Sequence, residues 1–385
     1  MKSTVTRLAI YAVTIGVAVL ALLAGVGYWY GAPKYTTHSI PIWAYPSHVR
    51  ANEIWWIDND RVVFTGADPN IVVPSENPNR PSELLAIYIW DTKRNEYKRY
   101  AELNVLGRVT CYEHGTIKYF VQGPVDKSIG VQRIDGYQAV LGQDPQPWVV
   151  APKVDGVARG LWLMSRFGCT AMWETDLARP EHTLHENIIR PLWSEDGYLY
   201  SPSNSRDKNY PSLMWTPVQM WRPGAQKGIP LPIMIKELSG TSLYFSDYKN
   251  VYILPAGVRG DETRPSIAGY LPGKERPVYF ISRNGDVETK WFPNEDWVAV
   301  GEGFLPTVSG HFVISNFTRR AQSLDAGAWL ITKSRSHKLI DNLIDEFSVS
   351  PNGCKAVVSI ANPDKKPQFS RSMTVFNFCD AGGGK

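Results

Sequence analysis

The sequence is poor in charged residues, and its basic residues are not gathered in any one stretch. Asp, Glu, Lys and Arg together make up only 20% of the 385 residues, and the formal net charge is +4. Lys and Arg are scattered along the chain in small pairs. A nucleic-acid-binding domain concentrates such residues on one face or in one run. The sequence therefore argues against a nucleic acid as partner.

Motifs of catalytic and cofactor chemistry are also missing. There is no Gly-x-Ser-x-Gly elbow for a serine nucleophile, and the Gly382–Gly384 run ends the chain with no helix after it. His182, His185 and Glu186 lie close together, but their order fits no zinc-protease motif. On a strand the two histidines would point to opposite faces. We therefore expect no catalytic residue, no metal site and no cofactor.

Long apolar runs are absent except at the N-terminus. From Leu8 to Trp29 there is no charged residue, a run of about 22 residues where ~20 are needed to cross a bilayer. Tyr28, Trp29 and Tyr30 follow as an aromatic cluster suited to the headgroup level. The sequence predicts that residues 1–30 are a short cytoplasmic stub and an uncleaved, single-pass transmembrane signal anchor.

The charges around this run predict its orientation. Lys2 and Arg7 precede it, so the positive-inside rule places the N-terminus in the cytoplasm and the remainder outside. In a Gram-negative bacterium that compartment is the periplasm. The alternative is a cleavable signal peptide, because Gly25-Val26-Gly27 resembles a small-residue cleavage site.

Cysteine is scarce, with four residues in the chain. Cys354 and Cys379 fall in the last two predicted strands, and we expect them to form a disulfide, as suits an exported domain. Cys111 and Cys169 either pair with each other or remain buried thiols, since spacing alone does not decide between the two.

The residues that are abundant are those of strands and turns. The chain has 14 Trp, 19 Tyr, 31 Gly and 28 Pro, and helical periodicity is almost absent. Hairpins of two alternating strands around a polar turn recur, with turn centres near residues 59, 115, 155, 197, 249, 310 and 353. A second series of strands lies out of phase with them. Four strands repeated every ~40–50 residues are typical of a propeller blade, whereas a large β-sandwich is the alternative.

These repeats predict an all-β fold, a β-propeller of seven blades, with six or eight left open. It is expected over residues 38–379, after a linker at 31–37 and before a flexible tail at 380–385. The last repeat lacks a fourth strand, and the strand at His38–Ala44 has no repeat of its own. We expect this N-terminal strand to complete the last blade and close the ring, which leaves no sheet edge open.

Two of the hairpins carry a family resemblance. The turn Ser350-Pro351-Asn352-Gly353 and its flanking strands resemble the repeat of TolB-type and WD40-like propellers, and Trp193–Leu199 is a looser second match. The resemblance covers two of the repeats well and the others only by pattern. It implies a propeller and nothing about a substrate.

The tryptophans divide by their place in the predicted strands. Six lie within strands, where we expect them to fill the core: Trp55, Trp90, Trp162, Trp173, Trp221 and Trp329. Five others lie nearer to strand ends, where a sugar-stacking role is easier to accommodate: Trp148, Trp193, Trp215, Trp291 and Trp297.

Long, polar, Pro-punctuated connections are the expected binding elements, because loops on a rigid scaffold carry function. They are Ala67–Ser82, Ser201–Pro211 and Gly257–Arg276, with Arg319–Asp325 in addition. The candidate binding residues that they offer are Asp68, Asn77, Arg80, Arg206, Asp207, Lys208, Arg259, Asp261, Glu262 and Arg264.

The function expected from these features is binding rather than chemistry. We expect a membrane-anchored, extracytoplasmic propeller that holds a protein or glycan partner in the cell envelope. The alternative is a propeller enzyme acting on carbohydrate, which requires paired carboxylates ~5–10 Å apart near the central channel.

Overall fold

A computed structural model describes most of the predicted strands. The described residues are 15–17, 34–44, 54–73, 82–102, 108–113, 115–126, 131–148, 188–191, 198–200, 216–221, 227–235, 244–255, 276–292, 303–315, 327–332, 336–342, 344–361 and 371–379. Apart from the helical residues 15–17, the regular secondary structure in these ranges is β-strand, so the all-β prediction is confirmed for them.

The strands form antiparallel sheets whose spatial order follows the chain. Four separate sheets have four strands each. The first contains β6 (Arg108–Glu113), β7 (Thr116–Asp126), β8 (Val131–Val140) and β9 (Gln146–Trp148), and the second contains β10 (Ile188–Pro191), β11 (Tyr198–Tyr200), β12 (Thr216–Trp221) and β13 (Ile229–Ile235). The third contains β14 (Tyr244–Ser246), β15 (Val251–Pro255), β16 (Arg276–Ser282) and β17 (Val287–Phe292), and the fourth contains β18 (Gly303–Thr307), β19 (Gly310–Ser315), β20 (Gly327–Ile331) and β21 (Ser336–Ile340).

The remaining strands form one eight-stranded sheet with two halves. The first half contains β2 (Ile54–Trp56), β3 (Arg61–Val73), β4 (Ser82–Asp91) and β5 (Glu96–Glu102). The second half contains β22 (Ile344–Val349), β23 (Lys355–Ala361), β24 (Arg371–Asn377) and β1 (Thr36–Ala44).

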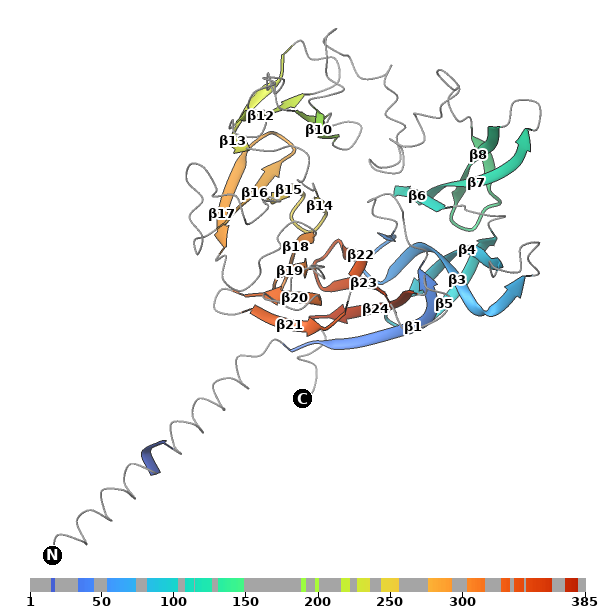
Figure 1. Ribbon diagram of the computed structural model, residues 1–385, viewed down its shortest axis with the longest axis horizontal. Helices are drawn as coiled ribbons and strands as arrows, with labels where there is room; N and C mark the ends of the chain where they lie inside the picture. The colour runs from blue at the N-terminus through green and yellow to red at the C-terminus, as the bar shows by residue number, and fades with distance from the viewer. Residues whose placement is uncertain are drawn as a thin grey trace, which may run out of the picture.

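The sheets stand around a common centre. In Figure 1 the first strand of each set, such as β6, β14, β18 and β22, is the one nearest the centre, and β13, β17 and β21 lie at the rim. Consecutive four-stranded antiparallel sheets arranged radially define a β-propeller. The hairpin predicted around residue 155 lies outside the described residues, so the number of blades stays a prediction.

Strand β1 joins the end of the propeller to its beginning. It runs antiparallel to β24, with Thr36 opposite Asn377, and it begins two residues earlier than the predicted strand. Its last residues, Trp43 and Ala44, pair with β3 in the first half of the sheet. The N-terminal strand therefore bonds to both the last and the first repeat.

Two predicted boundaries are wrong. The expected connection Ala67–Ser82 begins inside a strand, because β3 continues through a bulge to Val73, where it still pairs with β4. The hairpin predicted around residue 155 has Trp148 at the start of its first strand, but β9, which ends at Trp148, pairs with β8 as the outer strand of the β6–β9 sheet. The alternation of apolar and polar residues indicates that a strand exists, whereas only the pairing of the strand shows which sheet it joins.

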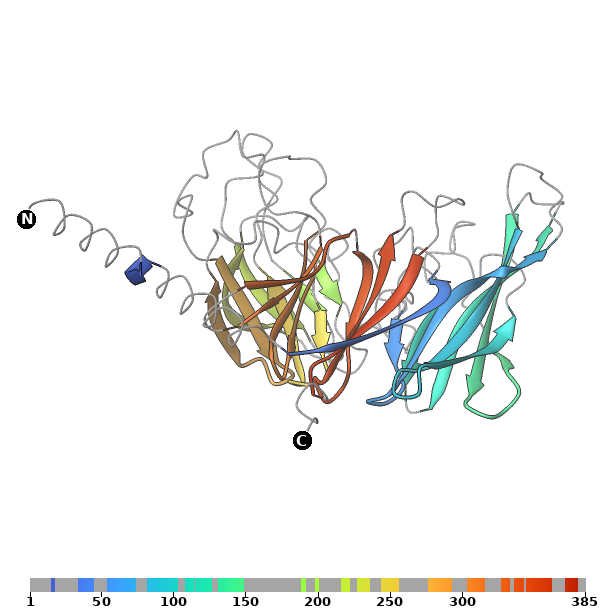
Figure 2. The same cartoon turned by 90° about the horizontal axis from the view of Figure 1, so that it is seen from below.

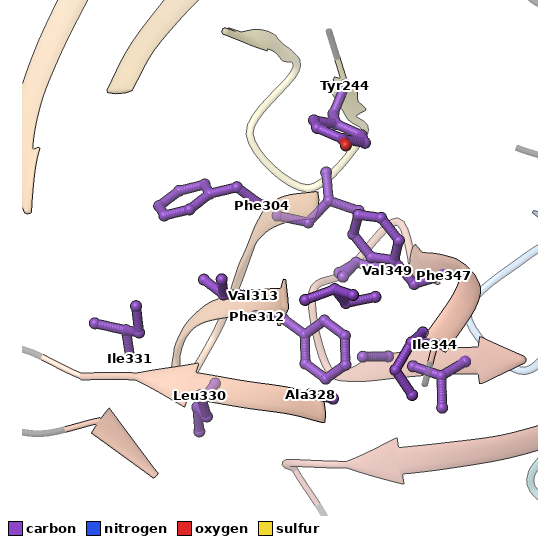
Figure 3. Packing of buried hydrophobic residues seen from close by; sticks show 14 of the residues in the cluster. Tyr244, Phe304, Phe312, Val313, Ala328, Leu330, Ile331, Ile344, Phe347 and Val349 are labelled. Carbon is purple, nitrogen blue, oxygen red and sulfur yellow. The ribbon is translucent and has the colours of Figure 1, made fainter. Parts of the chain in front are cut away.

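The core is formed by aromatic and branched side chains from facing sheets. Figure 3 shows Tyr244, Phe312 and Phe347 packed together with Phe304 beside them. The rings of Phe347 and Tyr244 lie 5.4 Å apart, and those of Phe347 and Phe312 lie 6.3 Å apart. Strands from three neighbouring sheets therefore share one buried cluster.

The tryptophans follow the predicted division where their side chains are described. Trp90 is fully buried, whereas Trp291 is 57% exposed on the outer strand β17. Trp55 and Trp329 are partly buried and pack against core clusters.

The predicted anchor lies almost entirely outside the described residues. Only Ile15–Val17 of the apolar run is described, as part of a helix. Among the described residues, no helix is long and apolar enough to cross a bilayer.

Candidate binding face

The strand order gives the propeller two different faces. Where the connection is described, first and second strands, and third and fourth strands, are joined by tight turns, which define the turn face. The described turns there lie at residues 57–61, 91–96, 140–146, 246–251, 282–287, 307–310 and 349–355. The connections from second to third strands begin and end at the opposite edge, the long-connection face. Figure 2 shows tight turns of both halves of the eight-stranded sheet at the lower edge of the molecule.

The turn between β22 and β23 is held by its own hydrogen bonds. The backbone N–H of Gly353 donates to the carbonyl oxygen of Ser350 over 2.8 Å. The Ser350 hydroxyl accepts from the backbone N–H of Lys355 at 2.9 Å and lies 2.8 Å from the Asn352 side-chain oxygen. Gly353 has a φ of 72°, which favours glycine.

This same turn contacts the other half of its own sheet and two further sheets. The backbone N–H of Asn352 donates to the side-chain oxygen of Asn59 over 3.0 Å, and the carbonyl oxygen of Gly353 accepts from Val308 N–H over 3.0 Å. A Cβ on Gly353 would lie 2.6 Å from the Tyr248 ring. The turn therefore lies where the sheets converge, and its hydrogen bonds connect neighbouring turns of the turn face.

Lys355 extends these contacts into a buried polar network. Its side chain is 8% exposed, and its Nζ donates to Asp60 Oδ1 over 2.6 Å and to Thr92 Oγ1 over 3.0 Å. The Thr92 hydroxyl in turn donates to the Asp60 carbonyl oxygen over 2.7 Å. The network joins the second half of the eight-stranded sheet to two turns of its first half.

Asp60→Asn is expected to lower the free energy of unfolding by about 2 kcal/mol, because a largely buried ammonium loses its carboxylate partner. The control is Asp58→Asn in the same turn. Asp58 pairs with Arg61 over 2.7 Å, but both side chains are more than two-fifths exposed, so its loss should be under about 1 kcal/mol. Urea denaturation measures both, and equal losses would contradict the difference in burial.

The control carboxylate is held mainly by local hydrogen bonds. Burial alone would raise the pKa of Asp58, but hydrogen bonds from the backbone N–H groups of Asp60 and Arg61 and from the Arg61 guanidinium lower it. In the Asp58→Asn variant the side-chain amide would keep an acceptor oxygen for the two backbone groups.

The predicted disulfide closes the same region. Cys354 and Cys379 are bonded, with Cα atoms 5.3 Å apart and a sequence separation of 25. Cys379 lies just beyond the end of β24, so the bond links the β22–β23 turn to the end of the last strand. Cys169 lies outside the described residues, so its pairing with Cys111 stays open.

His311 directly follows the turn at residues 307–310 and packs against aromatic rings. Its ring lies 4.9 Å from that of Phe304 and 5.9 Å from that of Phe280. Burial, with a smaller contribution from the positive charges of Lys290 and Lys249, lowers the pKa of His311 to about 4.

Acid should therefore destabilise the propeller through His311. Its pKa in the unfolded chain is about 6.5, so as the pH falls from about 6.5 to 4 the unfolded state binds the proton first and stability is lost. Above that range the residue is neutral in both states and contributes no pH dependence. His311→Phe should keep the ring packing and lose less stability than the wild type between pH 7 and 4.5, measured by denaturant midpoints. Identical pH profiles would contradict this.

Of the candidate binding residues, Asp68 alone lies among the described residues. Its Oδ1 accepts from the backbone N–H and the side-chain amide of Asn70, over 2.9 and 3.0 Å. It also lies near Tyr88, whose pKa is raised by burial and then by the charge of Asp68. Nine candidates lie outside the described residues: Asn77, Arg80, Arg206, Asp207, Lys208, Arg259, Asp261, Glu262 and Arg264.

The strand ends that flank these candidates share one face. The predicted connections join β3 to β4, β11 to β12, β15 to β16 and β19 to β20, and each pair is the second and third strand of its sheet. In antiparallel sheets of one radial order, these strand ends lie at the same edge. In the sequence the connections are separate stretches, with no sign that they begin at a common face.

Acidic groups near the centre are few in the described strands. Among the described inner strands, the carboxylate residues are Glu113, Asp345 and Glu346. Glu346 is 7% exposed, and sequence reasoning missed it although a charge inside an apolar strand was the available signal. No group of three or more His, Cys, Asp or Glu suited to a metal ion occurs among the residues that the structure describes.

Comparison with known proteins adds little. No family model and no curated protein matches the chain. One similar solved structure is the β-propeller domain of the Trilobed protease from Pyrococcus furiosus, with a TM-score of 0.31 and 12% identity over 83% of this chain and 80% of that one. Another is a chain of a Mitotic Checkpoint Complex, with a TM-score of 0.37 and 11% identity over 90% of this chain and 91% of that one. A third is an α-L-arabinanase from Penicillium chrysogenum complexed with arabinobiose, with a TM-score of 0.36 and 12% identity over 90% of this chain and 99% of that one. At these TM-scores the propeller assignment depends on the chain's own sheets, and membership of the TolB-type family stays a prediction.

Proposed function

We propose that the protein is a membrane-anchored, extracytoplasmic β-propeller that binds a protein or glycan partner through its long-connection face. The observation that carries the proposal is the difference between the two faces. The turns of one face are short and bonded to one another through Asn352, Gly353 and Lys355. The connections that hold the candidate polar residues all begin at the other face, which is the one left for a partner.

Seven blades form part of the proposal. The four separate sheets and the two halves of the eight-stranded sheet supply six sets of four strands. Residues 149–187 lie between β9 and β10 and amount to about one repeat of ~40 residues. The sequence predicts strands at Leu161–Met164 and Cys169–Trp173 in this range, which supports one further blade.

Anchoring is supported by the apolar run at residues 8–29 and by the position of β1. The run is long enough to cross a bilayer. β1 begins only a few residues after it, so the propeller is held close to the membrane.

The test is a pull-down of the full-length, tagged protein from crosslinked membranes, followed by mass spectrometry. Variants in which Ser201–Pro211 or Gly257–Arg276 is replaced by a short Gly-Ser linker should lose the recovered partners. The matched control is a turn-face substitution, Asn284→Ala, which should keep them. Partners that survive both loop replacements would contradict the proposed binding face. If no protein is recovered, binding to a glycan array tests the glycan partner, and hydrolysis of a glycan would favour the enzyme alternative.

A further inference from the structure

The outer strand of the β14–β17 sheet has an open edge at the rim of the propeller (Figure 1). β17 pairs with β16 on one side, and no strand among the described residues pairs with its other side. The outer strand of the neighbouring sheet, β13, contains Pro230 and Pro232, which lack the N–H groups that a further strand would need. β17 contains no proline. Its edge is therefore able to accept another strand.

The pairing of β17 with β16 shows which of its backbone groups point outward. The N–H of Ser282 donates to the carbonyl oxygen of Asp286 over 2.8 Å, so these two residues form a hydrogen-bonded pair. Such pairs alternate with non-hydrogen-bonded pairs along an antiparallel ladder, and the register of β16 with β17 is unbroken. The N–H and C=O groups of Val287, Thr289 and Trp291 therefore point away from β16, toward the rim.

The charges of β17 are complementary to those of a second copy of the same strand. The side chain of Glu288 is 65% exposed and that of Lys290 is 38% exposed. A two-fold axis through Thr289 places Glu288 of each copy directly opposite Lys290 of the other. Opposite charges that face each other across two strands stabilise their pairing.

The backbone and the large apolar side chain of this edge favour the same register. With the axis at Thr289, Val287 of each copy is opposite Trp291 of the other, so the residues whose backbone groups point outward form the hydrogen-bonded pairs. Trp291 is 57% exposed, and an aromatic ring opposite a β-branched side chain is a favourable cross-strand pair. The pairing therefore covers the exposed ring and satisfies the outward N–H and C=O groups together.

We propose that two copies of the chain associate through β17, which joins their β14–β17 sheets into one antiparallel sheet across a two-fold axis at Thr289. The contact goes beyond the proposed function, because it uses the rim and leaves the long-connection face free for a partner. Antiparallel pairing points the turn faces of the two copies in opposite directions. Because the contact is short, the dimer is weak and its population depends on concentration.

Sedimentation velocity of the full-length protein over a series of concentrations measures this association. Detergent micelles are used, because in them the two predicted anchors need not enter one bilayer. Glu288→Lys and Lys290→Glu each place like charges opposite one another twice in the dimer and should raise its Kd about tenfold or more. The variant that carries both changes has opposite charges again, in exchanged positions, and should associate as the wild type does.

Thr289→Pro is a second, independent test. It removes an outward N–H at the two-fold axis without taking a hydrogen bond from β16, so it should abolish the association while the sheet keeps its fold. Circular dichroism checks the fold of every variant, and the charge variants decide the question if Thr289→Pro does not fold.

A wild-type protein that stays monomeric at every concentration would overturn the proposal. Association that withstands both single charge reversals, or that the double change does not restore, would place the contact on another surface and overturn it as well. Neither result touches the proposed function, because recovery of a partner by the long-connection face is measured separately in the pull-down.

Discussion

Replacing Cys354 and Cys379 together by serine is expected to lower the free energy of unfolding by about 3.5 kcal/mol. The disulfide closes a loop with a sequence separation of 25, and the loop-entropy relation gives this value for a chain of that length. Serine is the suitable replacement, because position 354 lies in the turn that contacts Asn59 and Tyr248 and should keep a small polar side chain. The measurement is urea denaturation of the wild type and the variant in oxidising buffer.

The control for this prediction is a reductant. Reducing the wild type should bring its denaturation midpoint down to that of the double-serine variant, and the variant should not respond. A variant that remains as stable as the oxidised wild type would show that the β-strand pairing of β1 and β24 alone holds the last repeat. A response of the variant to reductant would assign part of the effect to Cys111 and Cys169.

The hairpins were predictable because their signals are local. The turns near residues 59, 115, 249, 310 and 353 each combine a polar or Gly-containing centre with alternating strands on both sides, and the structure has a tight turn at each of them. The disulfide was predictable for a similar reason, since its two cysteines fall at the ends of strands expected to be neighbours. A hairpin turn is encoded within about ten residues of chain, and the two cysteines are separated by only 25 positions.

The contacts between repeats were not predictable. Lys355 reaches Asp60 across 295 positions of sequence, and nothing around either residue marks the pair. The same limit explains the error at Trp148, because an outer strand of one sheet and an inner strand of the next have the same alternation. It also explains why the candidate binding residues form separate groups in the sequence, although their flanking strands end at one face.

Gly353→Ala should be among the most damaging single substitutions on the turn face, with a loss of about 3 kcal/mol. Two causes add: a residue with a Cβ is strained at a φ of 72°, which costs roughly 1–2 kcal/mol, and the Cβ would lie 2.6 Å from the ring of Tyr248, which adds an overpacking cost of about 1–3 kcal/mol. Gly115→Ala separates the two causes. Gly115 has a φ of 83° and nothing within 4 Å of its Cβ position. The stability lost in Gly115→Ala should therefore come from backbone strain alone.

The Tyr248→Ala, Gly353→Ala double variant completes the argument as a double-mutant cycle. If the contact with the Tyr248 ring causes the larger loss of stability in Gly353→Ala, removing the ring should restore most of the free energy of unfolding by which Gly353→Ala falls below Gly115→Ala. Equal losses for the two single glycine variants would show that the turn moves away from Tyr248 at no cost. Because the contact lies on the turn face, Gly353→Ala should weaken the junction between sheets while leaving partner capture by the long-connection face intact at temperatures where the protein stays folded. Loss of capture under those conditions would place the binding surface on the turn face instead.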